Sequence, residues 1–146
     1  MIAPRHLAAL LPLVFALPAA AGEADAIQVE SPHVRLMPAA ATNSAAFMLL
    51  RNGASAQARL VAVASPVAER VELHDHLRDG DVMRMRRVDS VPIAANGQAL
   101  LQPGGLHVML IGLKRPLKDG EAVPLDLEFA DGSHKRVSAP VQPIRP

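Results

Sequence analysis

The chain has no cysteine, no tryptophan, no tyrosine and only three phenylalanines among its 146 residues. Without a thiol there is no disulfide scaffold, zinc ribbon, iron–sulfur cluster, cysteine nucleophile or blue-copper centre. So few aromatic rings leave no platform on which single-stranded nucleic acid could stack. A formal net charge of +1 also gives no strongly basic surface for phosphate backbones, so no nucleic-acid partner is expected.

Catalytic motifs are missing as well. The sequence contains no nucleophile elbow, no zincin helix and no phosphate-binding loop, and we do not expect an enzyme. What the chain does have is six methionines and six histidines. A protein without thiols can still bind a soft metal ion through thioether and imidazole groups.

The N-terminus resembles a secretory signal peptide. Arg5 supplies a positive start, residues 7–21 are apolar, and Ala-x-Ala patterns follow, as in cleaved export signals. The apolar stretch is shorter than the roughly 20 residues that span a bilayer, and no cysteine follows it for lipid attachment. We therefore expect residues 1–26 to be removed near position 21 or 26. Residues 27–146 would form one periplasmic domain without stable membrane insertion.

The sequence after residue 26 has the pattern of β structure. Short apolar or alternating runs recur without a helical period, separated by turn signals such as Asp79-Gly80 and Asp131-Gly132. This pattern predicts a single all-β domain, a sandwich or a small barrel. The last residues, 141–146, contain two prolines and are expected to trail along the surface. The predicted strands are 27–36, 45–52, 58–65, 70–77, 82–88, 98–101, 106–113, 122–130 and 134–141.

Three of these predicted strands carry histidine or methionine at alternate positions. Alternate residues of a strand share one face, so adjacent strand ends could bring these side chains together. Thioether is neutral and soft and imidazole is borderline, a combination that suits Cu(I) better than zinc or hard cations. The pairs are His74 with His76, Met83 with Met85, and His107 with Met109.

The spacing of four of these residues resembles the PCuAC family of periplasmic copper chaperones. The family pattern is His, ten residues, Met, 21 residues, His, one residue, Met. It falls on His74, Met85, His107 and Met109 without a gap. The flanking segments VELHDH and LQPGGLHVMLIGL, and the upstream segment SPHVRLMPAAATNSAAFMLLRN, are similar to the family too.

The resemblance implies a cupredoxin-like Greek-key β-sandwich that holds one Cu(I) at an exposed edge through these four side chains. It also implies a task, which is to deliver copper to the CuA centre of cytochrome c oxidase, with subunit II as the protein acceptor. We expect such a carrier to be a monomer. Some relatives have a His- and Met-rich tail for a second copper ion, whereas this chain ends VSAPVQPIRP.

Other functions and residue roles stay open at this point. The chain could be a periplasmic copper buffer or resistance protein without a dedicated acceptor, or a metal-independent interaction module. His76 and Met83 could be spare ligands or neighbours at the rim. Met37 and Met48 are expected in the core or rim, and His134 at the surface.

Basic residues flank the predicted ligands. They could form an ordinary solvated face or a rim that steers an acidic acceptor toward the metal. These residues are Arg84, Arg86 and Arg87 around Met85, and Lys114, Arg115 and Lys118 after Met109.

Overall fold

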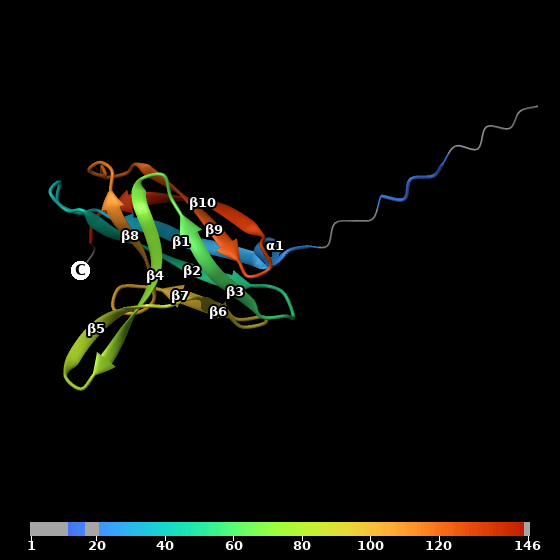
Figure 1. Ribbon diagram of the computed structural model, residues 1–146, viewed down its shortest axis with the longest axis horizontal. Helices are drawn as coiled ribbons and strands as arrows, with labels where there is room; N and C mark the ends of the chain where they lie inside the picture. The colour runs from blue at the N-terminus through green and yellow to red at the C-terminus, as the bar shows by residue number, and fades with distance from the viewer. Residues whose placement is uncertain (1–11, 17–20, 145–146) are drawn as a thin grey trace, which may run out of the picture.

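The structure, a computed structural model, describes residues 12–16 and 21–144. Almost all of its regular elements are strands, which confirms the all-β prediction (Figure 1). In chain order the elements are α1 (Glu23–Ala26), β1 (Ile27–Arg35), β2 (Asn43–Asn52), β3 (Ala58–Ala64), β4 (Ala68–Asp79), β5 (Val82–Arg87), β6 (Val91–Ile93), β7 (Gln98–Leu101), β8 (His107–Leu113), β9 (Ala122–Phe129) and β10 (His134–Gln142).

The strands form one continuous hydrogen-bonded path. Its order is β5-β4-β8-β2-β1-β10-β9-β3-β6, and β7 pairs with β2 off this path. All neighbours are antiparallel except β1 and β10, which pair in parallel over a short stretch. The hairpin of β4 and β5 projects beyond the rest of the domain in Figure 1. Gly80 opens its two-residue turn with φ 62, a conformation that glycine adopts without steric cost.

The core is aliphatic, as the composition predicts. In β9 every second residue is buried, which gives the strand one inward face of Val123, Leu125, Leu127 and Phe129. Leucine, isoleucine and valine side chains from the other strands complete this core, together with Met48. Burial of their methyl and methylene groups contributes about 0.8 kcal/mol per CH₂.

Two parts of the β structure differ from the sequence prediction. The short strand β6 was not predicted, because three residues with a central Pro92 are too few to show an alternation. The prediction that residues 141–146 trail along the surface is wrong for Val141. Val141 is fully buried and pairs with Val34, where β1 and β10 meet.

Residues 22–26 also belong to the folded body. The backbone N–H of Glu23 donates to Asp131, the backbone N–H of Ala24 donates to Ser133 Oγ, and the Ala24 side chain is buried. No helix within the described residues is long and apolar enough to cross a membrane. Most of the predicted signal peptide lies outside the described residues.

Candidate metal centre

The predicted ligands lie on neighbouring strands, β5, β4 and β8, at one end of the sheet order. On β8 the side chains of Val108 and Leu110 enter the core. The alternation of the strand therefore turns His107 and Met109 to the opposite face. This adjacency is the arrangement that the alternating sequence pattern predicts.

Strand register sets which side chains face each other. His76 of β4 lies opposite Met85 of β5, and His74 of β4 lies opposite His107 of β8. The ring centroid of His107 is 5.1 Å from that of His76 and 5.8 Å from that of His74. Both β4 histidines therefore lie near His107, on the same face of the sheet.

A pocket of about 380 Å³ opens on this face. Two imidazoles, His76 and His107, and three thioethers, Met37, Met85 and Met109, line it. His74 is not among the lining residues. The other lining residues are Arg35, Asn43, Ser44, Ala45, Phe47, Pro103 and Gly104.

The loop before β8 orients the two imidazoles of the pocket. The carbonyl oxygen of Gly105 accepts a hydrogen bond from Nδ1 of His107 at 2.9 Å and a longer one from Nδ1 of His76 at 3.4 Å. A carbonyl can only accept, so in both rings the proton lies on Nδ1. Each Nε2 then carries an unshared electron pair, which is the form of histidine that binds metal ions.

His107 is the most enclosed of the pocket imidazoles, with 3% of its surface exposed. Burial lowers its pKa, and the nearby His76, His74 and Arg35 lower it further, against the hydrogen bond to Gly105, which raises it. A lowered pKa keeps this ring neutral at neutral pH. It can then bind a cation without first losing a proton.

His74 is bound differently. Its Nε2 donates to Oε2 of Glu72 at 2.8 Å, and both side chains are mostly buried, at 14% and 16% exposed. The other carboxylate oxygen of Glu72 pairs with Arg70 at 3.0 Å. The hydrogen bond from His74 is the main reason that the pKa of Glu72 is lowered, and Arg70 and Arg87 add to it. Nδ1 of His74 is buried and has no hydrogen-bond partner.

The donors of the pocket fit a soft ion. Within the described residues, no three His, Cys, Asp or Glu side chains gather closely enough to hold a metal ion by themselves. A metal site here therefore needs the thioether sulfurs. Neutral sulfur and imidazole favour Cu(I) over zinc, calcium or magnesium.

The other three described methionines lie in the core, at the surface and at the edge of the pocket. Met48 is buried in the core, as predicted. Met83 shares a face of β5 with Met85 but is 50% exposed and does not line the pocket. Met37 reaches the pocket from the segment between β1 and β2. No alternation in that segment points to a ligand, so the sequence indicated only a core or rim position.

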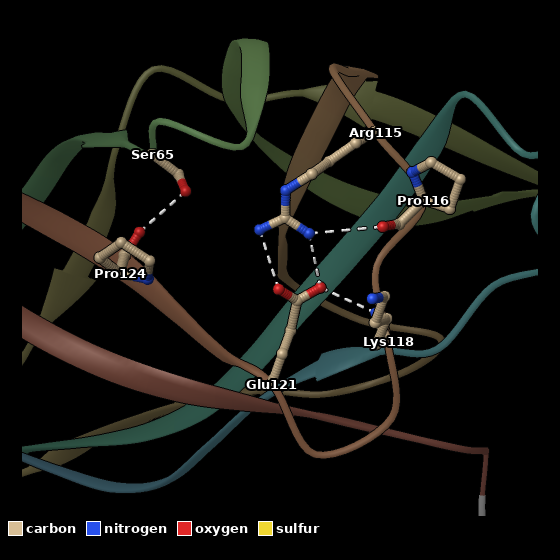
Figure 2. Close-up of polar contacts among 6 residues, drawn as sticks. All are labelled: Ser65, Arg115, Pro116, Lys118, Glu121 and Pro124. Atoms are coloured by element: carbon tan, nitrogen blue, oxygen red, sulfur yellow. Dashed lines mark hydrogen bonds and ion pairs between the residues drawn. The ribbon is translucent and has the colours of Figure 1, made fainter.

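Three of the other side chains considered in the sequence, His134, Arg84 and Arg115, have polar partners. His134 is exposed, as predicted, and its Nδ1 lies 3.2 Å from Asp126 Oδ2. In the basic group, Arg84 pairs with Asp79 at 3.5 Å. Arg115 pairs with Glu121 at 2.8 Å, in a cluster that also ties the backbone N–H of Lys118 to the same carboxylate (Figure 2).

Comparison with known proteins identifies the family. Residues 27–141 match the family model described as "Putative lipoprotein LpqE-like". The chain belongs to the LpqE-like family. It is 35% identical to "Putative lipoprotein Lxx21020" of Leifsonia xyli subsp. xyli, over 82% of this chain and 72% of that protein. It is 30% identical to the uncharacterised protein RP573 of Rickettsia prowazekii, over 68% of this chain and 56% of that protein.

Solved structures extend the likeness of this LpqE-like protein to copper-binding domains. It superposes on the Cu(I) form of DR1885 from Deinococcus radiodurans with a TM-score of 0.66 and 37% identity, over 82% of this chain and 81% of that one. The apo form of DR1885 matches with a TM-score of 0.66 and 34% identity, over 97% of each chain. The copper-bound PCuAC domain from PmoF2 gives a TM-score of 0.71 at 24% identity, over 82% and 94% of the two chains. The cupredoxin-like fold predicted from the sequence is therefore confirmed.

Proposed function

We propose that this LpqE-like protein is a periplasmic copper chaperone of the PCuAC type. It binds one Cu(I) as cargo and has no catalytic role. Met85, His107 and Met109 act as ligands together with an imidazole of β4, for which the sequence pattern predicts His74. The bound ion is then handed to a copper enzyme, with the CuA site of cytochrome c oxidase subunit II as the acceptor.

The observation that carries the proposal is the donor set of the pocket. Imidazoles with a free Nε2 and thioethers converge from three strands on one face. The ligands need no thiol, which suits a compartment where thiols oxidise. The likeness to the copper-loaded form of DR1885 supports the same cargo.

The pocket also suits transfer rather than permanent storage. Met85 is 48% exposed at the edge strand β5, so an acceptor can approach the ion from that side. Basic side chains of β5, Arg84, Arg86 and Arg87, are exposed around it. They would favour the approach of an acidic acceptor surface.

Export is part of the proposal, because the family model and the Leifsonia xyli relative are named as lipoproteins and residues 1–26 resemble a signal peptide. This chain has no cysteine that could carry a lipid. Since residues 22–26 pack on the folded body, cleavage after Ala21 is favoured over cleavage after Ala26. Mass spectrometry of the exported protein tests this site, and a start at Ile27 would contradict it.

A transfer experiment tests the function. The protein loaded with one equivalent of Cu(I) is mixed anaerobically with the apo, reduced soluble domain of oxidase subunit II, and the copper in each protein is measured after separation. We expect the copper to move to the acceptor. The transfer should be faster than transfer from a Cu(I)–chelator complex of similar affinity. Copper that stays on the carrier beside a competent acceptor would favour a buffer. A chain that never binds Cu(I) would favour a metal-independent module.

A further inference from the structure

The short helix α1 lies against the turn between β9 and β10 (Figure 1). The backbone N–H groups of Glu23 and Ala24 donate to the carboxylate of Asp131 at 2.7 Å and to Ser133 Oγ at 2.9 Å. The carboxylate of Glu23 in turn accepts the backbone N–H of Arg59 in β3 at 3.2 Å. Before β1 begins, the chain is therefore fastened both to β3 and to the β9–β10 turn.

Two carboxylates lie close to Gly22, the residue before α1. Its backbone nitrogen donates to Oδ2 of Asp25 at 3.0 Å, and a Cβ atom built on Gly22 would lie 3.3 Å from Oδ2 of Asp131. The same Cβ would lie 2.7 Å from Cβ of Ser133, so only glycine fits here without a shift of the turn. Hydrogen bonds from Ser133 and from the backbone of Glu23 lower the pKa of Asp131, which keeps that carboxylate charged at neutral pH.

Cleavage after Ala21 would convert the nitrogen of Gly22 into an α-ammonium group. The small residues at 19 and 21 form an Ala-x-Ala pattern, as at signal peptidase sites, and Ala21 is exposed. A peptide nitrogen has one N–H and no charge, whereas an ammonium has three N–H donors and a positive charge. Its hydrogen bond to Asp25 would then be charge-assisted, which is about twice as strong as the neutral form. The additional donors also allow a contact with the neighbouring Asp131.

We propose that the α-ammonium of Gly22, created by removal of the signal peptide, binds the carboxylates of Asp25 and Asp131 and so completes this end of the fold. The inference rests on the export that is part of the proposed function, and it is independent of the copper ligands. A chain that starts at Ile27 would lose the backbone donors to Asp131 and Ser133. A chain that starts at Gly22 keeps them and gains an ion pair.

The charge of this terminus makes stability depend on pH. The ordinary pKa of an α-amine is about 7.7–8.0, and carboxylates beside the folded terminus raise its pKa because they favour the charged form. The stabilisation is then complete below the ordinary pKa and is lost as the pH rises through the raised value.

Other charged groups on the elements around α1 titrate elsewhere. They are Glu23 of α1, Arg51 of β2, Arg59 of β3, Asp131 of the β9–β10 turn, and His134 and Lys135 of β10. The carboxylates and arginines keep their charge across the range in which an α-amine titrates. Histidine titrates near about 6.5 and lysine near about 10.4, so changes between about pH 7.5 and 9.5 report the terminus.

NMR of the exported protein tests the ion pair. The full chain is expressed with its own signal-like segment, the mass of the exported form gives its first residue, and ¹³C-labelled glycine reports the amine through the Cα of Gly22. We expect a start at Gly22 and an amine pKa about 0.5–1 above the ordinary value, which is about threefold to tenfold tighter proton binding. Asp25→Asn and Asp131→Asn keep an oxygen acceptor but remove a charge, and each should lower this pKa. Asp81→Asn, at an exposed acid of the β4–β5 turn, should not change it.

Urea denaturation gives a second readout. Acetylation of the α-amine keeps an N–H donor and removes the charge, so it should lower the urea midpoint of wild type at pH 7 by about 0.2–0.5 M. The loss should be smaller in Asp25→Asn, where one partner of the ammonium has lost its charge. A start at another residue, an ordinary amine pKa in wild type, or equal losses on acetylation in the two proteins would overturn the proposal.

Failure of this inference is distinguishable from failure of the proposed function. A chain that stays in the cytoplasm with residues 1–21 attached contradicts export and the ion pair together. An exported chain that begins at Gly22 but has an ordinary amine pKa overturns the ion pair alone. Copper binding and delivery are decided by the transfer experiment and do not depend on either result.

Discussion

The two ends of the strand order use the same alternation of side chains for different purposes. In β9 the inward residues are large and almost fully buried, and the outward ones are Ala122, Pro124, Asp126 and Glu128. In β5, β4 and β8 the outward face carries imidazole and thioether groups, several with unshared electron pairs. All six residues of β5 are exposed. Stability and copper binding should therefore be separable by mutation.

The largest effect is expected in the core. Phe129 is almost fully buried in β9, and Phe129→Ala should lower the free energy of unfolding by about 3–5 kcal/mol, because it removes buried surface and leaves a cavity. Urea denaturation of the apo protein measures this loss. Cu(I) affinity of the molecules that remain folded should not change. A loss of affinity equal to that of a ligand variant would break the separation of the two regions.

Met85 and Met83 provide the sharpest comparison within one strand. Both lie on the same face of β5, at 48% and 50% exposed, and only Met85 lines the pocket. We expect Met85→Leu to weaken Cu(I) binding about tenfold or more, since it removes a thioether but keeps the apolar volume. Met83→Leu should have no effect on a competition titration with a Cu(I) chelator.

Stability supplies the control for this pair. Neither substitution should change the unfolding free energy of the apo protein by more than about 0.5 kcal/mol, as is usual for exposed positions. Equal copper affinities in the two variants would mean that the pocket is not what distinguishes these methionines.

A smaller effect is expected at Met37. This side chain lines the pocket from the segment between β1 and β2, outside the four-residue spacing. Met37→Leu should weaken Cu(I) binding by less than about tenfold, because two imidazoles and two thioethers remain. The same competition titration measures it beside Met85→Leu. A loss as large as that of Met85→Leu would make Met37 a principal ligand.

The smallest effect is expected at the Arg115–Glu121 pair, away from the pocket. Hydrogen bonds from Arg115 and from the backbone of Lys118 lower the pKa of Glu121 below its ordinary value of 4.5. A lowered carboxyl pKa adds stability above that ordinary value, and the gain is lost as pH falls through the folded-state pKa. Arg115→Met should therefore be slightly less stable than wild type at neutral pH, by urea denaturation.

The pH profile distinguishes this ion pair from simple packing. The difference between wild type and Arg115→Met should shrink as the pH falls well below 4.5, since Glu121 is then protonated in both proteins. Glu121→Gln should show the same loss at neutral pH. A difference that stays constant across the whole range would assign the effect to the packing of Arg115.

The sequence predicts features that depend on neighbouring residues better than features that depend on contacts between distant parts of the chain. Alternation and the Asp79-Gly80 turn were enough to predict β4, β5 and β8 and the face that their His and Met side chains share. They could not find β6, which is too short to show a period, or α1, which lies in the predicted signal peptide. Met37 reaches the pocket from outside any strand, and its role is visible only in three dimensions.

The β4 ligand shows the same limit at one residue. A period of two places His74 and His76 on one face, so the pattern alone cannot choose between them. The contacts that differ are the carboxylate of Glu72 on one ring and the distant Gly105 carbonyl on the other. The family spacing selects the first ring, His74, whose buried Nδ1 has no hydrogen-bond partner.

X-ray absorption at the copper edge tests the central claim most directly. It is recorded on the protein carrying one equivalent of Cu(I), with Met85→Leu as the comparison. The account predicts a Cu(I) edge with a mixed shell of imidazole nitrogen and thioether sulfur, and a reduced sulfur contribution in the variant. A shell of nitrogen and oxygen only, unchanged in Met85→Leu, would contradict it.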